Sequence, residues 1–191
     1  MSKKENYVEK AEKYYAEKKF NDAIYWYTRA ISERNNDAEL YSERAVAHFH
    51  NGDLKSSLAD MNDAQAIEPE RAYRYASRAY IKDAMGDVKG AVEDYQIAVK
   101  LDPEDAVAHN NLGLLQEKLG YHQQAKVLFD FADELAKDGL KPGETRQMPK
   151  NIQRELDRTK KKSSVSNEVS KVLTTKKGLA EFLTFIRNGF K

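Results

Sequence analysis

Hydrophobic residues over most of the chain recur three and four positions apart, the spacing of one face of an α-helix. The helical stretches are short, and turn signals separate them. At Gly52-Asp53 and Gly86-Asp87, a glycine that can adopt a left-handed conformation ends one helix and an acid caps the next. Pro69 and Pro103 each end the following helix, because proline lacks the backbone N–H. The pattern predicts an all-α fold built from pairs of helices.

The helix pairs are copies of one unit that repeats every 34 residues. Three columns of small residues and two columns of bulky residues stay in register through all copies. The columns are Ala11, Ala45, Ala79 and Gly113; Ala23, Ser57, Ala91 and Ala125; Ala30, Ala64, Ala98 and Ala132; Tyr27, Met61, Tyr95 and Phe129; and Tyr7, Tyr41, Tyr75 and His109. The four predicted copies span residues 4–37, 38–71, 72–105 and 106–139. Because one helix pair cannot bury both of its faces, the copies are expected to stack on each other.

These columns resemble the tetratricopeptide repeat (TPR) family, which combines small residues at helix crossings with an aromatic residue and a terminal proline. The resemblance covers residues 4–139 and implies a right-handed α-solenoid of four helix-turn-helix repeats. One position departs from the family pattern, since Lys10, Arg44 and Arg78 replace a leucine that returns only at Leu112. The long stems of these cations are expected to cover apolar surface.

The resemblance also implies a concave groove, lined by the first helix of each pair, that binds a peptide or a helix. The predicted groove residues are Glu5, Glu9, Glu12, Glu39, Glu43, Val46, Phe49, Tyr73, Ser77, Tyr80, Asn110, Asn111 and Leu114. Such a groove is acidic at one end, aromatic in the middle and lined by amides at the other end, where asparagine could bond a peptide backbone. The expected ligand therefore carries basic and apolar residues. The alternative is that the glutamates form a solvated helix face without a ligand.

One ligand of related domains is not expected here. Chaperone-binding members hold the C-terminal carboxylate of a heat-shock chaperone with lysine, asparagine and arginine at fixed groove positions. In this chain those positions hold Val8, Glu12, Glu43, Tyr73 and Ser77 or, one copy later, Ser42, Val46, Ser77, Val107 and Asn111. Neither set supplies a cation for a carboxylate.

The remaining residues differ in character from the repeats. Residues 140–162 predict a loop and a polar capping helix, and residues 163–191 predict a basic amphipathic C-terminal helix. The expected docking residues of this last helix are Val172, Leu179, Phe182, Leu183 and Ile186. Its apolar stripe is expected to pack against the same chain, a second copy in a homodimer, a partner protein or a membrane surface. Residues 1–136 carry a net charge of −7 and residues 137–191 a net charge of +8, so the two parts should attract each other.

Composition adds mainly exclusions. The chain has no cysteine and no apolar run of the ~20 residues that cross a bilayer. It also starts without an apolar targeting segment, so a cytoplasmic location is expected. No phosphate-binding loop, nucleophile elbow or paired metal-binding histidines occur, and no cofactor, metal or enzymatic activity is expected. The predicted function is a protein-interaction scaffold, with its own C-terminal helix as a candidate regulator. The alternative is an adaptor that brings cargo to an anionic membrane or nucleic acid, although the charge of the tail gives nucleic-acid binding little support.

Overall fold

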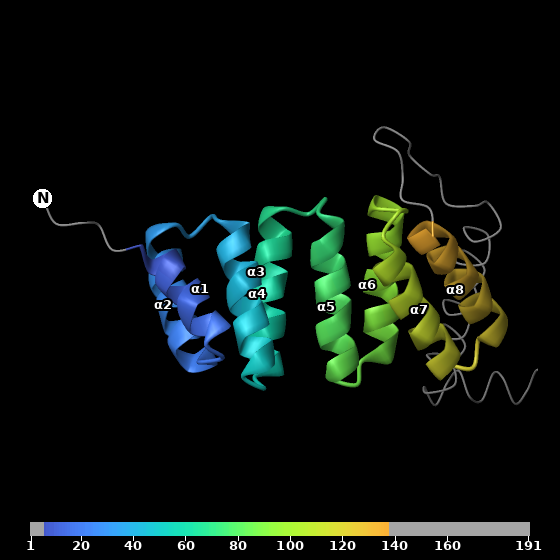
Figure 1. Cartoon of the computed structure of the whole chain (residues 1–191), viewed down its shortest axis with the longest axis horizontal. Helices are drawn as coiled ribbons and strands as arrows, with labels where there is room; N and C mark the ends of the chain where they lie inside the picture. Colours follow the sequence, from blue (N-terminus) through green and yellow to red (C-terminus); the bar gives the residue numbers. More distant parts are fainter. Residues whose placement is uncertain (1–5, 138–191) are drawn as a thin grey trace, which may run out of the picture. The chain divides into compact units, whose positions relative to one another are not determined.

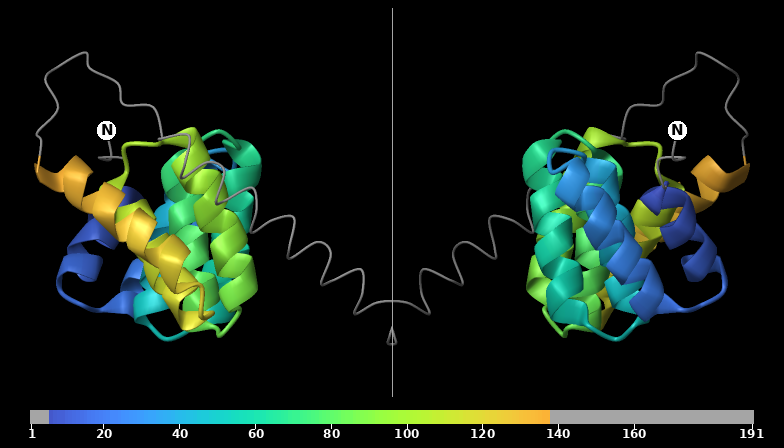
Figure 2. Two further views of the ribbon diagram at one scale, coloured as in Figure 1. Left: turned by 90° about the vertical axis from the view of Figure 1, so that its right-hand side faces the viewer. Right: turned by 90° about the vertical axis from the view of Figure 1, so that its left-hand side faces the viewer.

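The computed structural model describes residues 6–137, which form eight α-helices without a β-strand in that range (Figure 1). Each predicted copy contributes two helices. The helices are α1 (Tyr7–Ala16), α2 (Phe20–Glu33), α3 (Ala38–His50), α4 (Leu54–Ile67), α5 (Ala72–Ala84), α6 (Val88–Leu101), α7 (Ala106–Lys118) and α8 (His122–Lys137). Each helix packs on the next one along the chain, so the described part is a helical solenoid. Viewed from its two ends, it shows α1 and α2 at one end and α7 and α8 at the other (Figure 2). The all-α prediction is confirmed.

The turn between the two helices of each copy uses a left-handed backbone conformation. The φ angles are +82° at Gly52 and +84° at Gly86, as the sequence predicted, and +81° at Gly120 in the last copy. In the first copy the equivalent residue is Lys18, with a φ of +57°. A side chain in this region clashes with its own backbone, so the first turn is strained where the other three are not.

The predicted caps are also present. The carboxylate of Asp53 accepts a hydrogen bond of 3.1 Å from the backbone N–H of Ser56, and Asp87 accepts one of 2.9 Å from Gly90. These bonds satisfy backbone donors that a helix leaves unpaired in its first turn. The second helices of the two central copies therefore start where the sequence indicates.

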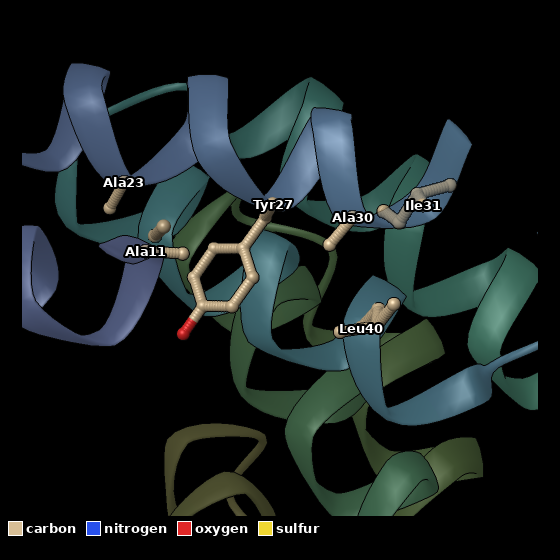
Figure 3. Close-up of a cluster of buried hydrophobic side chains, with 7 residues drawn as sticks. Ala11, Ala23, Tyr27, Ala30, Ile31 and Leu40 are labelled. Atoms are coloured by element: carbon tan, nitrogen blue, oxygen red, sulfur yellow. The ribbon is translucent and has the colours of Figure 1, made fainter. Parts of the chain in front are cut away.

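Small residues form the centre of each helix pair. Ala11, Ala23 and Ala30 are almost fully buried and surround the ring of Tyr27, which is 1% exposed (Figure 3). In the last copy the small residue is Gly113, and a Cβ atom built there would lie 2.6 Å from Cε1 of Phe129. The small columns thus leave room for the bulky column, and in the last copy only glycine leaves enough.

The cations at the departing position do more than cover apolar surface, which corrects the expectation for Arg44 and Arg78. The guanidinium of Arg44 donates bonds of 2.8 and 2.7 Å to the two carboxylate oxygens of Asp60. Arg78 makes the same pair of bonds, also 2.8 and 2.7 Å, to Asp94. Both carboxylates are buried, so each of the two central copies contains an internal ion pair.

Several predicted features lie outside the described residues. They are Glu5, the expected loop and capping helix at 140–162, the expected helix at 163–191, and its docking residues Val172, Leu179, Phe182, Leu183 and Ile186. Within residues 6–137, every helix is too short or too polar to cross a membrane.

Candidate ligand-binding face

Side chains of the first helices α1, α3, α5 and α7 contact one another from copy to copy. We call the surface that they form the first-helix face. The rings of Phe49 on α3 and Tyr80 on α5 have their centroids 5.2 Å apart. Further along, Nζ of Lys118 on α7 lies 2.9 Å from a carboxylate oxygen of Asp83 on α5. Of the predicted groove residues, these contacts bring together Phe49 and Tyr80, while Lys118 and Asp83 lie outside that set.

The predicted groove residues differ in their exposure to solvent. Seven are exposed: Glu9, Glu12, Glu39, Tyr73, Tyr80, Asn110 and Leu114. Five are partly buried: Glu43, Val46, Phe49, Ser77 and Asn111. All twelve described members therefore keep some surface that a ligand could reach.

Glu43 is the centre of the acidic end of this face. Burial raises the pKa of its carboxyl group, and the negative charges of Glu39 and Glu12 raise it further, while a hydrogen bond from Tyr27 opposes the shift. The phenol of Tyr27 donates this bond across 3.3 Å. Burial, together with the Glu43 charge, also raises the pKa of Tyr27. Negative charge is thus concentrated here, and a cation bound nearby would relieve the repulsion.

An aromatic row crosses the first three copies beside the acidic end. The ring of His50 lies 5.8 Å from that of Tyr15 and 5.4 Å from that of Phe20, on which it stacks. On its other side, His50 lies 5.7 Å from Phe49, which continues the row to Tyr80. Phe20 and His50 were not among the predicted site residues. Their row forms only because the stack brings the end of α3 against the turn between α1 and α2.

Tyr73, at the start of α5, contacts the acidic end of the face. Its ring is 41% exposed, and its hydroxyl donates a hydrogen bond of 2.6 Å to a carboxylate oxygen of Glu39. Burial of the hydroxyl, followed by this bond, raises the pKa of Tyr73 to about 12. The guanidinium of Arg74 lies 4.8 Å from the centre of the ring and is fixed by a bond of 2.8 Å to Glu68. Tyr73 is therefore held in place while part of its ring stays accessible.

The far end of the face is more apolar than the amide-lined end that the sequence predicts. Val107 and Leu114 on α7 are 69% and 51% exposed. The amide nitrogen of Asn111 already donates a bond of 3.1 Å to the hydroxyl of Tyr95, and Asn110 is exposed. Exposed apolar side chains of this size commonly mark a binding surface when they occur together.

The described residues contain little that would support chemistry. No three acidic or histidine side chains in residues 6–137 lie close enough to hold a metal ion. His109 is fully buried, with its ring against Phe131 and its Nε2 atom 3.0 Å from the carbonyl oxygen of Pro103. Burial lowers the pKa of His109, which suits a neutral packing residue.

Known proteins share both the repeat and the fold. The family model described as a TPR repeat matches residues 11–52 and 83–120. Among curated protein sequences, none matches this chain.

Solved structures of TPR proteins superimpose on the chain. A crystal structure of MamA is 23% identical with a TM-score of 0.65, covering 69% of this chain and 77% of its own, and this likeness concerns the fold alone. The first TPR domain of Spaghetti (RPAP3), bound to the HSP90 peptide SRMEEVD, is 26% identical with a TM-score of 0.57 and covers 60% of this chain and 90% of its own. The TPR domain of Arabidopsis OM64 is 25% identical with a TM-score of 0.55, covering 58% of this chain and 92% of its own.

Proposed function

Because the chain belongs to the tetratricopeptide repeat family, whose fold serves as a scaffold for protein–protein interaction, we propose that its first-helix face binds a peptide carrying basic and apolar residues. The basic part of the ligand lies against Glu9, Glu12, Glu39 and Glu43. The apolar part lies along the aromatic row and the exposed residues of α7. The ligand adopts an extended or helical conformation, as both fit a face built from parallel rows of side chains.

The observation that carries this proposal is the exposure of large apolar side chains directly beside the acidic end. Tyr73 and Tyr80 are 41% and 57% exposed, and Tyr80 packs on Phe49. Tyrosine combines a large apolar ring with a hydroxyl, and it is over-represented among residues that dominate binding energy. The neighbouring carboxylates favour cationic partners and disfavour acidic ones.

The ligand chemistry differs from that of one similar structure. The peptide bound to the RPAP3 domain, SRMEEVD, carries three acids against one arginine. Chaperone-binding members hold the peptide carboxylate with lysine, asparagine and arginine, and this chain has none of these residues at the matching positions of the first register. Those positions are Val8, Glu12, Glu43, Tyr73 and Ser77. We therefore propose that this chain selects peptides of the opposite charge.

Fluorescence anisotropy with labelled peptides of equal length tests the proposal. One probe joins lysines and arginines to leucine and phenylalanine, a second replaces the cations with glutamates, and the third is SRMEEVD. We expect the first probe to bind the full chain more tightly than the other two, and its affinity to fall with salt because the attraction is partly electrostatic. Equal binding of all three probes would contradict the proposal.

Matched variants place the site on the molecule. Glu9→Lys and Glu12→Lys should weaken binding of the basic probe and reduce its salt dependence, and Tyr80→Ala should weaken it at every salt concentration. Glu93→Lys, which reverses an exposed charge on α6, is the control and should have no effect. If Glu93→Lys weakens binding as much as Glu9→Lys, the first-helix face is not the site.

The C-terminal segment adds a proposed level of regulation. Residues 137–191 carry a net charge of +8 and an apolar stripe, so this segment matches the ligand chemistry that we propose for the first-helix face. Docking of the tail in cis would compete with external peptides and lower their apparent affinity. No described residue favours the alternative of an adaptor for an anionic membrane or nucleic acid.

A further inference from the structure

The outer side of the first helix pair carries cations and aromatic rings. We call this surface, formed by Tyr7, Lys10, Trp26 and Arg29, the head face. The rings of Tyr7 and Trp26 stack 5.7 Å apart, Nζ of Lys10 lies 4.2 Å from the centre of the Trp26 ring, and the Arg29 guanidinium lies 5.6 Å from that of Tyr7. Trp26 is partly buried and packs against the core of the first helix pair. No described helix precedes this surface.

The equivalent surface of the second copy is an interface between copies. Its residues Tyr41 and Arg44 occupy the positions of Tyr7 and Lys10, 34 residues later. The Tyr41 hydroxyl donates a bond of 3.1 Å to the carbonyl oxygen of Asn35, and Nη1 of Arg44 donates one of 3.0 Å to the hydroxyl of Thr28 on α2. This surface thus bonds to the helix pair that precedes it.

The third copy repeats the arrangement. Arg78 donates bonds of 3.2 Å to Asn62 and 3.0 Å to Gln65, both on the preceding helix α4. Gln65 also donates a bond of 2.8 Å to the hydroxyl of Tyr75. In the interfaces before the second and third copies, therefore, an arginine and a tyrosine bond to polar groups of the preceding copy, whereas the fourth copy has Leu112 and His109 at these positions.

The other end of the stack offers acceptors at the same positions. Asp130 and Asp133 on α8 follow Asn62 and Gln65 by two repeat lengths, and both are exposed. We call the surface of α8 around them the tail face (Figure 2, left). Where the α4–α5 interface has the neutral amides of Asn62 and Gln65, the tail face has carboxylates, which bind cations more strongly than amides do.

We infer that the head face of one molecule binds the tail face of a second copy, so that the chain associates head to tail. Lys10 then lies against Asp130 and Asp133, in the place of the contact that Arg78 makes with Asn62 and Gln65. Tyr7 and Trp26 supply the apolar part of the interface. The two surfaces are complementary in charge, and their residues occupy the same repeat positions as the residues that meet in the α4–α5 interface. A second copy of the chain therefore fits both surfaces.

The geometry sets the type of assembly. The head and tail faces are different surfaces, so the contact is heterologous and leaves one free head and one free tail after each addition. Association should therefore increase with concentration and not stop at a dimer. A single interface between repeats is small, so the affinity is expected to be modest.

Sedimentation equilibrium of the full chain, from micromolar to near-millimolar concentration, is the test. Lys10→Glu should weaken association on the order of fivefold, and so should Asp130→Lys combined with Asp133→Lys, because attraction becomes repulsion at one end. The carboxylates of α8 are exposed, so their variant should stay folded, which circular dichroism verifies. Lys100→Glu, an exposed charge reversal on α6, is the control and should leave association unchanged.

Mixing the two variants distinguishes head-to-tail contact from other modes. Each variant should associate poorly alone. In the mixture, the tail face changed by Asp130→Lys and Asp133→Lys meets the head face changed by Lys10→Glu, so the charges are again opposite and association should recover. The inference is overturned if the wild type stays monomeric throughout, or if either variant associates like the wild type. Failure of the mixture to recover overturns it as well, and in that case another occupant, such as the chain's own C-terminal segment, covers one of the faces.

Discussion

Arg44 and Asp60, sixteen residues apart in sequence, are joined by two hydrogen bonds of 2.8 and 2.7 Å between the guanidinium and the carboxylate. The side chains are only 17% and 8% exposed, so the pair is largely withdrawn from water. The bond to Asp60 is the main reason that the pKa of Arg44 is raised. Removal of one partner leaves the other as a buried, uncompensated charge.

We therefore predict that Asp60→Ala lowers the free energy of unfolding by about 3 kcal/mol, since it leaves the guanidinium unpaired. The double variant Arg44→Leu with Asp60→Leu should recover most of this loss. In the last copy the equivalent positions are already Leu112 and Leu128, both buried. Urea denaturation measures the difference, and a double variant less stable than Asp60→Ala would contradict this reading of the site.

These ion pairs show what the sequence reveals about the fold and what it hides. The repeat spacing predicted the helices, the turn glycines and the small columns, because those features depend on local spacing. The partners of Arg44 and Arg78 lie on the other helix of the pair, so no local pattern points to them. A signal was nevertheless present, since both arginines have an aspartate sixteen residues later, at Asp60 and Asp94.

The candidate site was predictable only in part, for a related reason. The family resemblance indicated which residues of α3 and α5 line the groove, and two of them, Tyr73 and Tyr80, are exposed. The aromatic row through Phe20 and His50 depends on how the turn of one copy meets the helix end of the next. Side-chain pairing such as that of Asn111 with Tyr95 also depends on packing between copies.

The strained turn of the first copy gives a second prediction. Lys18 has a φ of +57° where the other three copies have glycine. Lys18→Gly should raise the free energy of unfolding by up to about 1 kcal/mol, because glycine adopts this conformation without a steric penalty but loses more entropy on folding. Thermal unfolding measures the change. Glu17→Gly is the control and should destabilise, since Glu17 has a φ of −78° that needs no glycine.

Packing in the last copy gives a third prediction. A Cβ atom at residue 113 would lie 2.6 Å from the Phe129 ring, so Gly113→Ala should reduce the free energy of unfolding by about 1–3 kcal/mol. The smaller side chain of Phe129→Leu should compensate, and the double variant should be more stable than Gly113→Ala alone. Chemical denaturation measures the stability of the two single variants and the double variant. If Gly113→Ala is as stable as the wild type, the Phe129 ring moves aside without cost and the prediction is wrong.

The acidic end of the first-helix face should make stability depend on pH. The pKa of Glu43 is raised above its ordinary value of 4.5, mainly by burial and then by the negative charge of Glu39. The folded state therefore favours the protonated form, and ionisation of Glu43 lowers stability as the pH rises from 4.5 through the raised pKa.

Glu43→Gln removes that ionisation while keeping an acceptor for Tyr27, so the variant should melt higher than the wild type at pH 7. The difference should shrink as the pH falls below 4.5, where Glu43 is protonated in both states. Melting curves across this range test the sign. Glu93→Gln on the exposed surface of α6 is the control, and a larger gain at acidic pH than at pH 7 would contradict the assignment.

The last prediction concerns the C-terminal segment, whose expected docking residues Phe182, Leu183 and Ile186 lie outside the described residues. If the tail occupies the first-helix face, as we propose, its backbone amides should exchange slowly with deuterated solvent.

Leu183→Asp puts a charge into the apolar stripe, so it should release the tail and raise the rate of amide exchange across residues 165–190. The same variant should bind the basic peptide probe more tightly, because the competitor has been removed. Lys177→Asp is the control, because it makes the tail more negative but leaves the apolar stripe intact. Comparison of the two variants therefore separates the loss of apolar contact from the loss of electrostatic attraction. Fast exchange of residues 165–190 in the wild type, at concentrations that cover monomer and assembly, would mean that the tail does not dock on this chain.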